Sequence, residues 1–344
     1  TSLTTVVYTP NHAYAAPGDY MITLAVSGTM AFKGDGQGSM TLRFSSGSDK
    51  RDKVYQSAVR RVEIGAGVLK LGQGSFQNCT LLAYITIPNG VTIAEGYQFY
   101  NCYSLAFAVL PPGTAQVGYS MFFYCFSLVS AMLPNGISVV ENNAFAYCGA
   151  LISVRLPNTV SRIGSQAFGY CKPMHAIVIP NSVSIIEVSV FSNCSCLSSI
   201  DLPADLTSIG FNMFSGCSRL ASVTLPEGLT SIADRFFQYC YSLVTITLPD
   251  GVASIGSSAF YCCYALASVT MSSSVTSIAA SAFESCRGVR FYDFSSCTSI
   301  PTLANSNAFT GIPADCEIRV PVALAEEWKA ATNWATYADY IVGV

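Results

Sequence analysis

Charged residues and histidine are scarce in this sequence. Asp, Glu, Lys and Arg make up 11% of the 344 residues, and two histidines are present; about a quarter of an ordinary globular chain is charged. Nucleic-acid binding is disfavoured, because neutralising phosphates requires a clustered basic face and the formal net charge is −3. Histidine-based acid–base or Ser-His-Asp catalysis has almost no material to use. We therefore expect no enzyme activity and no cofactor.

Long apolar runs are also missing, although the composition is apolar overall. Hydrophobic residues make up 51% of the chain, and the mean hydropathy is +0.43. The longest apolar-leaning run, 121–133, contains two serines and is far shorter than the roughly 20 residues of a membrane-spanning helix. We expect no transmembrane segment and an apolar excess buried by stacked repeats. Because the chain begins at Thr1 without a leader, we expect it to have been processed or trimmed.

Ten of the fourteen cysteines follow a strict repeat. They recur every 23 residues, at positions 79, 102, 125, 148, 171, 194, 217, 240, 263 and 286, and each has a phenylalanine three residues before it. In the coil around Cys217, apolar residues at +6 and +8 from the cysteine alternate with polar residues and are stopped by Pro226. This pattern is typical of a short strand buried on one face. A stretched last coil places Phe309 26 residues after Phe283.

The repeat resembles the leucine-rich repeats, whose Leu-x-x-Leu-x-Leu signature is matched by residues 220–225. It is more similar to the BspA-like class of bacterial surface proteins, with Leu-x-x-Ile-x-Leu-Pro, then Val-x-x-Ile-Gly, then Ala-Phe-x-x-Cys; Leu151–Cys171 and Leu243–Cys263 fit this form nearly throughout. The resemblance implies an α/β repeat fold: a right-handed solenoid with a parallel β-sheet on its concave side and short helical or irregular convex segments. It also implies secretion or surface display, with adhesion or ligand binding.

Three regions follow from the extent of the repeat. Residues 62–312 are the solenoid of about eleven coils, residues 1–61 an N-terminal β region, and residues 313–344 a C-terminal cap. In the cap, the pattern predicts a strand at Glu317–Val320 and an amphipathic helix at 323–334, with Leu324, Trp328 and Ala331 on one face.

The N-terminal region resembles the closing hairpin of a PKD-like immunoglobulin-type domain. The resemblance rests on His12 and Tyr14, the Gly18–Tyr20 turn and the alternating residues 21–26. The Trp-Gly-Asp-Gly strand expected upstream is absent, so either the chain starts within that domain or the segment serves as an N-terminal cap. The glycine-rich segment 33–39 predicts a second hairpin, and residues 45–53 a polar loop.

Possible chemical sites have simpler structural interpretations. The register cysteines repeat once per coil beside a phenylalanine, so we expect inert core thiols rather than zinc ligands, and no metal site. Outside the register, Cys297 and Cys316 are candidates for a disulfide. The acids at +16, Glu95, Glu141 and Glu187, are interpreted as solvated turn residues rather than a glycosidase pair.

Ligand contact is predicted where side chains alternate with the buried +6 and +8 positions, at +5 and +7. In the first half of the chain these positions are mainly aromatic and aliphatic, and in the second they form a row of hydroxyls. The candidate ligand-binding residues on this concave face are Tyr84, Phe107, Val109, Met132 and Arg155. Contact with an N-terminal loop, or a homo-oligomer interface, would explain the apolar group equally well. Secondary candidates, which could stack on a ligand or shield the convex side, are Tyr124, Tyr147, Tyr170 and Tyr239.

Three functional hypotheses follow. The leading one is a non-catalytic extracellular or cell-surface adhesion protein that recognises a host protein, a matrix protein or a glycan through the solenoid surface. The second is a structural spacer or assembly module of a larger surface or phage-tail protein. The third is the non-catalytic part of a secreted enzyme.

Overall fold

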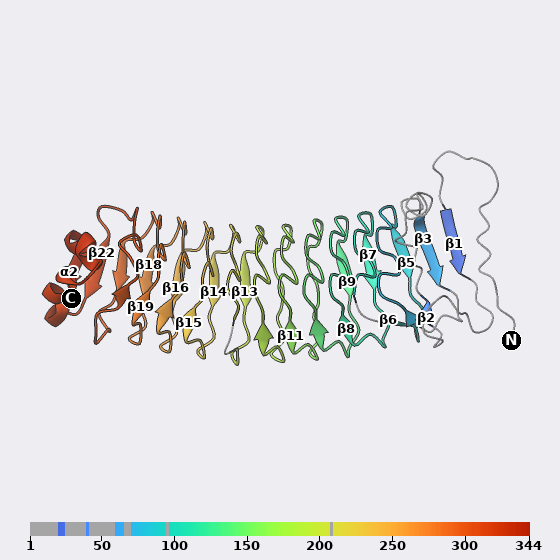
Figure 1. Cartoon of the computed structure of the whole chain (residues 1–344), viewed down its shortest axis with the longest axis horizontal. Coiled ribbons are helices and arrows are strands. Elements are labelled where there is room, and N and C mark those ends of the chain that lie inside the picture. Colours follow the sequence, from blue (N-terminus) through green and yellow to red (C-terminus); the bar gives the residue numbers. More distant parts are fainter. Residues whose placement is uncertain (1–19, 25–38, 41–58, 65–69, 94–95, 207–208) are drawn as a thin grey trace. The chain divides into compact units, whose positions relative to one another are not determined.

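The structure is a computed structural model that describes residues 20–24, 39–40, 59–64, 70–93, 96–206 and 209–344. The chain divides into two compact units, Thr1–Lys172 and Pro173–Val344. In each unit the chain winds into coils, and equivalent strands of successive coils pair in parallel (Figure 1). Most pairs join residues 23 apart, such as Phe107 with Ser130 and Thr245 with Ser268. The predicted leucine-rich-repeat solenoid is confirmed.

The first unit contains two series of short parallel strands. One series, at +5 to +7 in the register coils, consists of β1 (Tyr20–Leu24), β3 (Val59–Ile64), β5 (Tyr84–Thr86), β7 (Phe107–Val109) and β9 (Ser130–Met132). The other consists of β2 (Ser39–Met40), β4 (Lys70–Leu71), β6 (Thr92–Ile93), β8 (Gln116–Val117), β10 (Val139–Val140) and β11 (Arg162–Ile163). Within each series most strands pair in parallel with the equivalent strand of a neighbouring coil, although β5 and β7, and β6 and β8, belong to separate sheets.

The second unit repeats the arrangement. Its first series is β13 (Ser199–Asp201), β14 (Ser222–Thr224), β16 (Thr245–Thr247), β18 (Ser268–Thr270), β20 (Phe291–Asp293), β22 (Glu317–Val320) and β23 (Ile341–Gly343). Its second series is β12 (Ile185–Ile186), β15 (Ser231–Ile232), β17 (Ser254–Ile255), β19 (Ser277–Ile278) and β21 (Thr302–Leu303). Strand β22 lies where the sequence predicted it.

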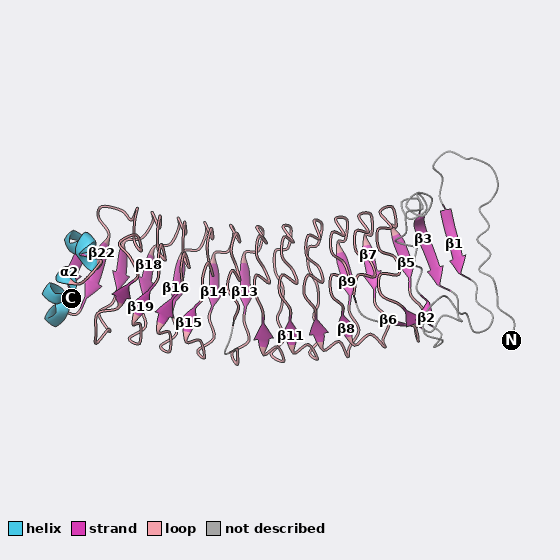
Figure 2. Cartoon of the chain, viewed as in Figure 1, coloured by secondary structure: helices cyan, strands magenta, loops and turns pink. Residues whose placement is uncertain are grey.

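Short helical or irregular segments were expected opposite the first sheet, and that side contains a second series of short strands and turns. Within the described solenoid coils no helix occurs, and strands and turns alone close each coil (Figure 2). Two features explain this. The residues at +14 and +15 are often a serine and an isoleucine, which suits a half-buried strand. The segment before each cysteine contains two left-handed residues, such as Asn143 (φ 57°) and Tyr147 (φ 62°), which turn the chain too sharply for a helix.

Two columns of side chains fill the core. The phenylalanines at −3 stack along each unit, with ring centroids of successive coils 4.9–6.1 Å apart and planes close to parallel. Phe309 stacks on Phe283 at 5.3 Å, which confirms the stretched last coil. The register cysteines, hereafter the cysteine ladder, are all buried. Eight of these cysteines donate a hydrogen bond from the S–H group to the backbone carbonyl of the phenylalanine 26 residues earlier, at 3.1–3.2 Å, as Cys102 does to Phe76.

The C-terminal segment covers the last coil with helical turns. The single helix expected over 323–334 is instead split into η1 (Val322–Leu324), α2 (Ala325–Ala330) and η2 (Trp334–Tyr340). The split follows from Asn333, which has φ 65° and donates through Nδ2 to the Leu303 carbonyl at 2.8 Å. Trp328 is fully buried, whereas Leu324 and Ala331 are only partly buried. The break lets Trp334 enter the core and donate Nε1–H to the Pro301 carbonyl at 2.7 Å.

Four further expectations receive no support from the structure or lie mainly outside the described residues. The predicted PKD-like hairpin receives no support: strand β1 pairs in parallel with β3, and the rest of the hairpin lies outside the described residues. The second hairpin and the polar loop also lie mainly outside them, although β2 pairs in parallel with β4. Cys297 and Cys316, the candidate disulfide, are free thiols.

Candidate functional site

The outward side chains of the first unit's sheet form an exposed apolar surface. Strands β5, β7 and β9 have buried central residues, while Tyr84, Phe107, Val109 and Met132 are 51%, 56%, 52% and 67% exposed. Val109 and Met132 are direct neighbours across the β7–β9 pair. We call these four residues the apolar sheet patch. The outward positions therefore lie where the sequence predicted them, with more than half of each of these side chains exposed.

Arg155, the fifth candidate on this face, occupies the next equivalent position after Met132. Its side chain is exposed, but its segment, 151–156, is not part of a strand. Arg155 therefore extends the face by one coil and adds a positive charge beside an apolar surface. The homo-oligomer interpretation of this face remains a prediction.

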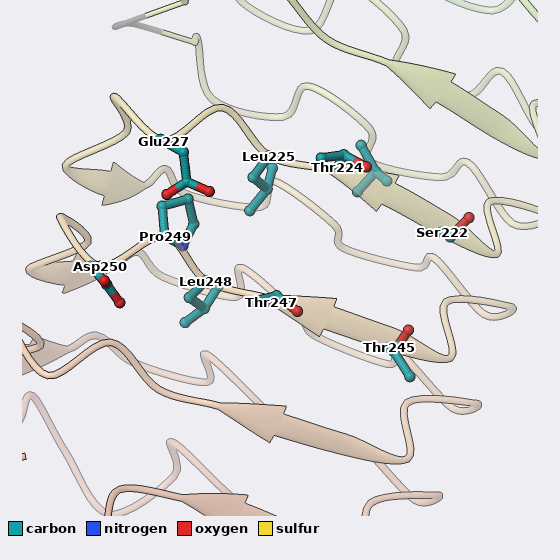
Figure 3. Close-up of a pocket in the computed structure, with 10 residues that line it drawn as sticks. Ser222, Thr224, Leu225, Glu227, Thr245, Thr247, Leu248, Pro249 and Asp250 are labelled. Carbon is teal, nitrogen blue, oxygen red and sulfur yellow. The ribbon is translucent and has the colours of Figure 1, made fainter. Parts of the chain in front are cut away.

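The sheet of the second unit has a polar face. A shallow groove of about 530 Å³ lies over β14 and β16 (Figure 3). Four hydroxyl side chains line it, and two carboxylates stand at the ends of the strands. The apolar residues Val223, Leu225, Leu248 and Pro249 also line it. We call this site the hydroxyl groove; its polar residues are Ser222, Thr224, Thr245, Thr247, Glu227 and Asp250. The hydroxyl row was visible in the sequence, but the two acids were missed. Their signal is the position directly after Pro226 and Pro249.

The secondary candidates, the tyrosines at −1, contact neighbouring aromatic rings. Tyr124 and Tyr147 lie 4.8 Å apart, and Tyr147 stacks on Tyr170 at 4.3 Å with an interplanar angle of 8°. Burial, together with the neighbouring Tyr170, raises the pKa of Tyr147. In the second unit Tyr239 contacts Tyr241 and Tyr261 edge-on. The arrangement favours the shielding interpretation, because a face held against another ring is not free to stack on a ligand.

These four tyrosines also occupy strained backbone positions. Their φ angles are 61–62°, a left-handed conformation that costs a bulky residue roughly 1–2 kcal/mol. Other coils have Asn or Gly at the same position, for example Asn193 and Gly216, for which the conformation is easier. Stacking contributes about 0.5–1.5 kcal/mol for each aromatic pair, which offsets this cost. We therefore regard the tyrosine column as a structural covering of the coils.

Catalytic or metal-binding groupings do not emerge from the described residues. No group of three or more His, Cys, Asp or Glu side chains in the described chain could hold a metal ion. Burial raises the pKa of the Cys79 thiol to about 12 and that of Cys102 well above its ordinary value, so these thiols are poor nucleophiles. Glu141 pairs with Arg162 at 3.2 Å, while Glu95 lies outside the described residues. Among described helices, none is long and apolar enough to cross a membrane.

A comparison with protein families decides the classification of these coils. The profile described as "BspA type Leucine rich repeat region" matches residues 52–175 and 161–290. The chain belongs to the BspA-type leucine-rich-repeat family. No curated protein matches it.

Solved structures of similar chains show the same fold as this BspA-type protein. A leucine-rich repeat protein from Bacteroides ovatus is 23% identical, with a TM-score of 0.61 over 84% of each chain. The pneumococcal vaccine antigen PcpA is 17% identical, with a TM-score of 0.54 over 83% of this chain and 79% of PcpA. A leucine-rich repeat protein from Eubacterium ventriosum is 17% identical, with a TM-score of 0.51 over 84% and 90% of the two chains.

Proposed function

We propose that this BspA-type protein is a non-catalytic extracellular or cell-surface binding protein that holds a protein ligand on its apolar sheet patch. The observation that supports the proposal is the exposure of more than half of each of Tyr84, Phe107, Val109 and Met132 on neighbouring strands. Contiguous exposed apolar groups on a folded protein usually mark an interaction surface. The regular strands beneath hold these side chains in place, so little order would be lost on binding.

The kind of ligand follows from the charge around the patch. No Asp, Glu, Lys or Arg occurs between Gly96 and Val140, the stretch that carries β7 and β9. A nucleic acid or an anionic surface would need basic side chains there. An apolar protein surface would bury Phe107, Val109 and Met132 without stranding a charge, with Arg155 one coil beyond Met132 at the edge of the contact. Completing the burial of a half-exposed Phe or Met contributes about 1 kcal/mol, half of the value for full burial.

The proposed location agrees with the state of the thiols. Thirteen of the fourteen cysteines are buried and all are free, so the folded protein protects them from an oxidising environment, where exposed thiols form disulfides. The analogy with PcpA, a vaccine antigen of the same fold, also supports a location outside the cell.

The test is a binding screen against immobilised host matrix and cell-surface proteins, followed by the double variant Phe107→Ala, Met132→Ala. We expect at least a tenfold loss of affinity for the captured protein, since truncating two central apolar anchors removes more than about 1.4 kcal/mol. Val178→Ala is the matched control, because Val178 occupies a +7 position and is 81% exposed but lies in the second unit. Equal affinity of the double variant and the unaltered protein would refute the patch as the binding site.

A further inference from the structure

The hydroxyl groove combines several polar groups that no protein group uses. Strands β14 and β16 lie side by side and project Ser222 and Thr224 from one coil, and Thr245 and Thr247 from the next (Figure 3). All four side chains are exposed. Within the described chain their hydroxyls form no hydrogen bond with another side chain or with the backbone. Other hydroxyls of this unit do, such as that of Thr276, which donates to the Ala253 carbonyl at 3.1 Å.

Two carboxylates complete the lining of the groove. Glu227 and Asp250 follow the prolines that end the two strand segments, and they occupy equivalent positions in adjacent coils. Both are exposed, and neither carboxylate pairs with a basic side chain in the described part of the chain. Two like charges in adjacent coils, without a cation between them, repel an anionic ligand and attract donors.

The chemistry of this lining selects a ligand rich in hydroxyl groups. A serine or threonine hydroxyl both donates and accepts a hydrogen bond, whereas an ionised carboxylate only accepts. A ligand that matches the groove must donate beside the carboxylates and both donate and accept along the strands. Neighbouring hydroxyls of a sugar meet both demands. A nucleic acid or an acidic polysaccharide places negative charge against Glu227 and Asp250, and a protein ligand would find no exposed apolar anchor among the lining residues.

The repeat of the fold matches the repeat of a polymer. Serine or threonine recurs at +5 on β13, β14, β16 and β18, and parallel strands lie about 4.8 Å apart. The groove spans two coils, whose strands β14 and β16 present hydroxyls at the same two positions, and the +5 hydroxyls continue on β13 and β18. A linear polysaccharide also repeats its hydroxyls at regular intervals, so it can contact several coils at once and gain affinity by multivalency.

We propose that the hydroxyl groove binds a neutral polysaccharide chain. The four hydroxyls contact its sugar hydroxyls along the strands, and Glu227 and Asp250 accept hydrogen bonds from its donor groups. This site is distinct from the apolar sheet patch: it lies in the other unit and takes a different class of ligand. The two proposals therefore fail independently, because neither depends on the residues that test the other.

Affinity gel electrophoresis of the full chain tests the proposal. The native gels contain soluble β-glucan, mannan, xylan or galactan as the neutral polymers, and polygalacturonic acid as the acidic one. We expect at least one neutral polymer to retard the protein, and polygalacturonic acid to leave its mobility unchanged. If none of the four neutral polymers retards it, or if the acidic polymer retards it as strongly, the proposal is overturned.

Two groove variants locate the binding. Thr245→Val, Thr247→Val removes two hydroxyls with little change of shape and keeps side chains that favour strands. Glu227→Gln, Asp250→Asn removes both charges. Each double variant should raise the dissociation constant for the retarding polymer at least tenfold. Thr230→Val and Glu327→Gln, exposed positions outside the groove, are the controls. If groove and control variants bind equally well and melt at the same temperature as the unaltered protein, the polymer binds elsewhere and the assignment is wrong.

Discussion

Alkaline pH should unfold this protein well below the range in which tyrosine titrates. Burial, as the largest cause, raises the pKa of eight thiols of the cysteine ladder, to about 12 for Cys79 and Cys286. In the unfolded chain a thiol loses its proton near pH 8.5. Above that pH the unfolded state binds fewer protons than the folded state, so the free energy of unfolding must decrease as the pH rises. The stabilisation is complete below about pH 8.5 and is lost towards the folded pKa.

The loss of unfolding free energy is large because the same buried thiol occurs in each of many coils. At pH 9.5, one unit above the unfolded thiol pKa, each protonated buried thiol costs the folded state about 1.4 kcal/mol relative to the unfolded state. Eight such thiols together amount to about 11 kcal/mol. This sum is comparable with the total unfolding free energy of a typical domain, about 5–15 kcal/mol.

The measurement is urea unfolding of the full chain, monitored by circular dichroism in the presence of a reductant at pH 7.5, 8.0, 8.5, 9.0 and 9.5. We expect the midpoint to change little between pH 7.5 and 8.0 and to fall steeply above pH 8.5. Tyrosine, with an ordinary pKa near 10, contributes little in this window.

A single substitution provides the matched control. Cys148→Ala should cost about 1–2 kcal/mol at pH 7.5, since it removes one buried heavy atom and its hydrogen bond to Phe122. Above pH 9, the unfolding free energy of this variant should fall with pH less steeply than that of the unaltered protein, by about 1.4 kcal/mol per pH unit. A midpoint that is constant from pH 7.5 to 9.5, or a Cys148→Ala variant with the same pH slope as the unaltered protein, would refute the reasoning.

Two further substitutions test how the coils and the cap are packed. Gly256→Ala should lower the free energy of unfolding by about 1–3 kcal/mol in urea unfolding, because the added Cβ would lie 2.6 Å from the Asp234 backbone nitrogen. Gly113→Ala, whose added Cβ would meet only Thr92 Cγ2 at 3.8 Å, should change it by less than about 0.5 kcal/mol, and equal effects would contradict the close approach. Tyr337→Phe should lower the free energy of unfolding by about 1–3 kcal/mol, because the Tyr337 hydroxyl accepts a hydrogen bond from the Phe309 N–H at 3.0 Å. An unchanged melting temperature would show that this bond is dispensable.

The sequence was most informative where each coil repeats its neighbour. The alternation around +6 and +8 predicted the first strand series and correctly placed Phe107 and Met132 on the outside. The 23-residue spacing of phenylalanine and cysteine predicted the buried columns. A signal repeated in ten coils outweighs local variation, because equivalent residues stack on one another and share the same burial.

Sequence reasoning failed where the outcome depends on contacts between coils or with the cap. The second strand series pairs only two residues per coil, too few for a periodic signal. The sequence left open whether the tyrosines at −1 stack on a ligand or shield the coils, because their contacts with neighbouring rings depend on the left-handed turn before each cysteine. The cap helix breaks at Asn333 because Trp334 reaches the core.

The strict 23-residue period therefore determined, by itself, the solenoid, its buried columns and its outward positions, since the burial of a repeated position follows from the pattern alone. Only the tertiary structure decided which outward groups lie together. Glu227 and Asp250 are 23 residues apart, as are Val109 and Met132, and each pair becomes a surface only because the fold places equivalent positions of adjacent coils side by side.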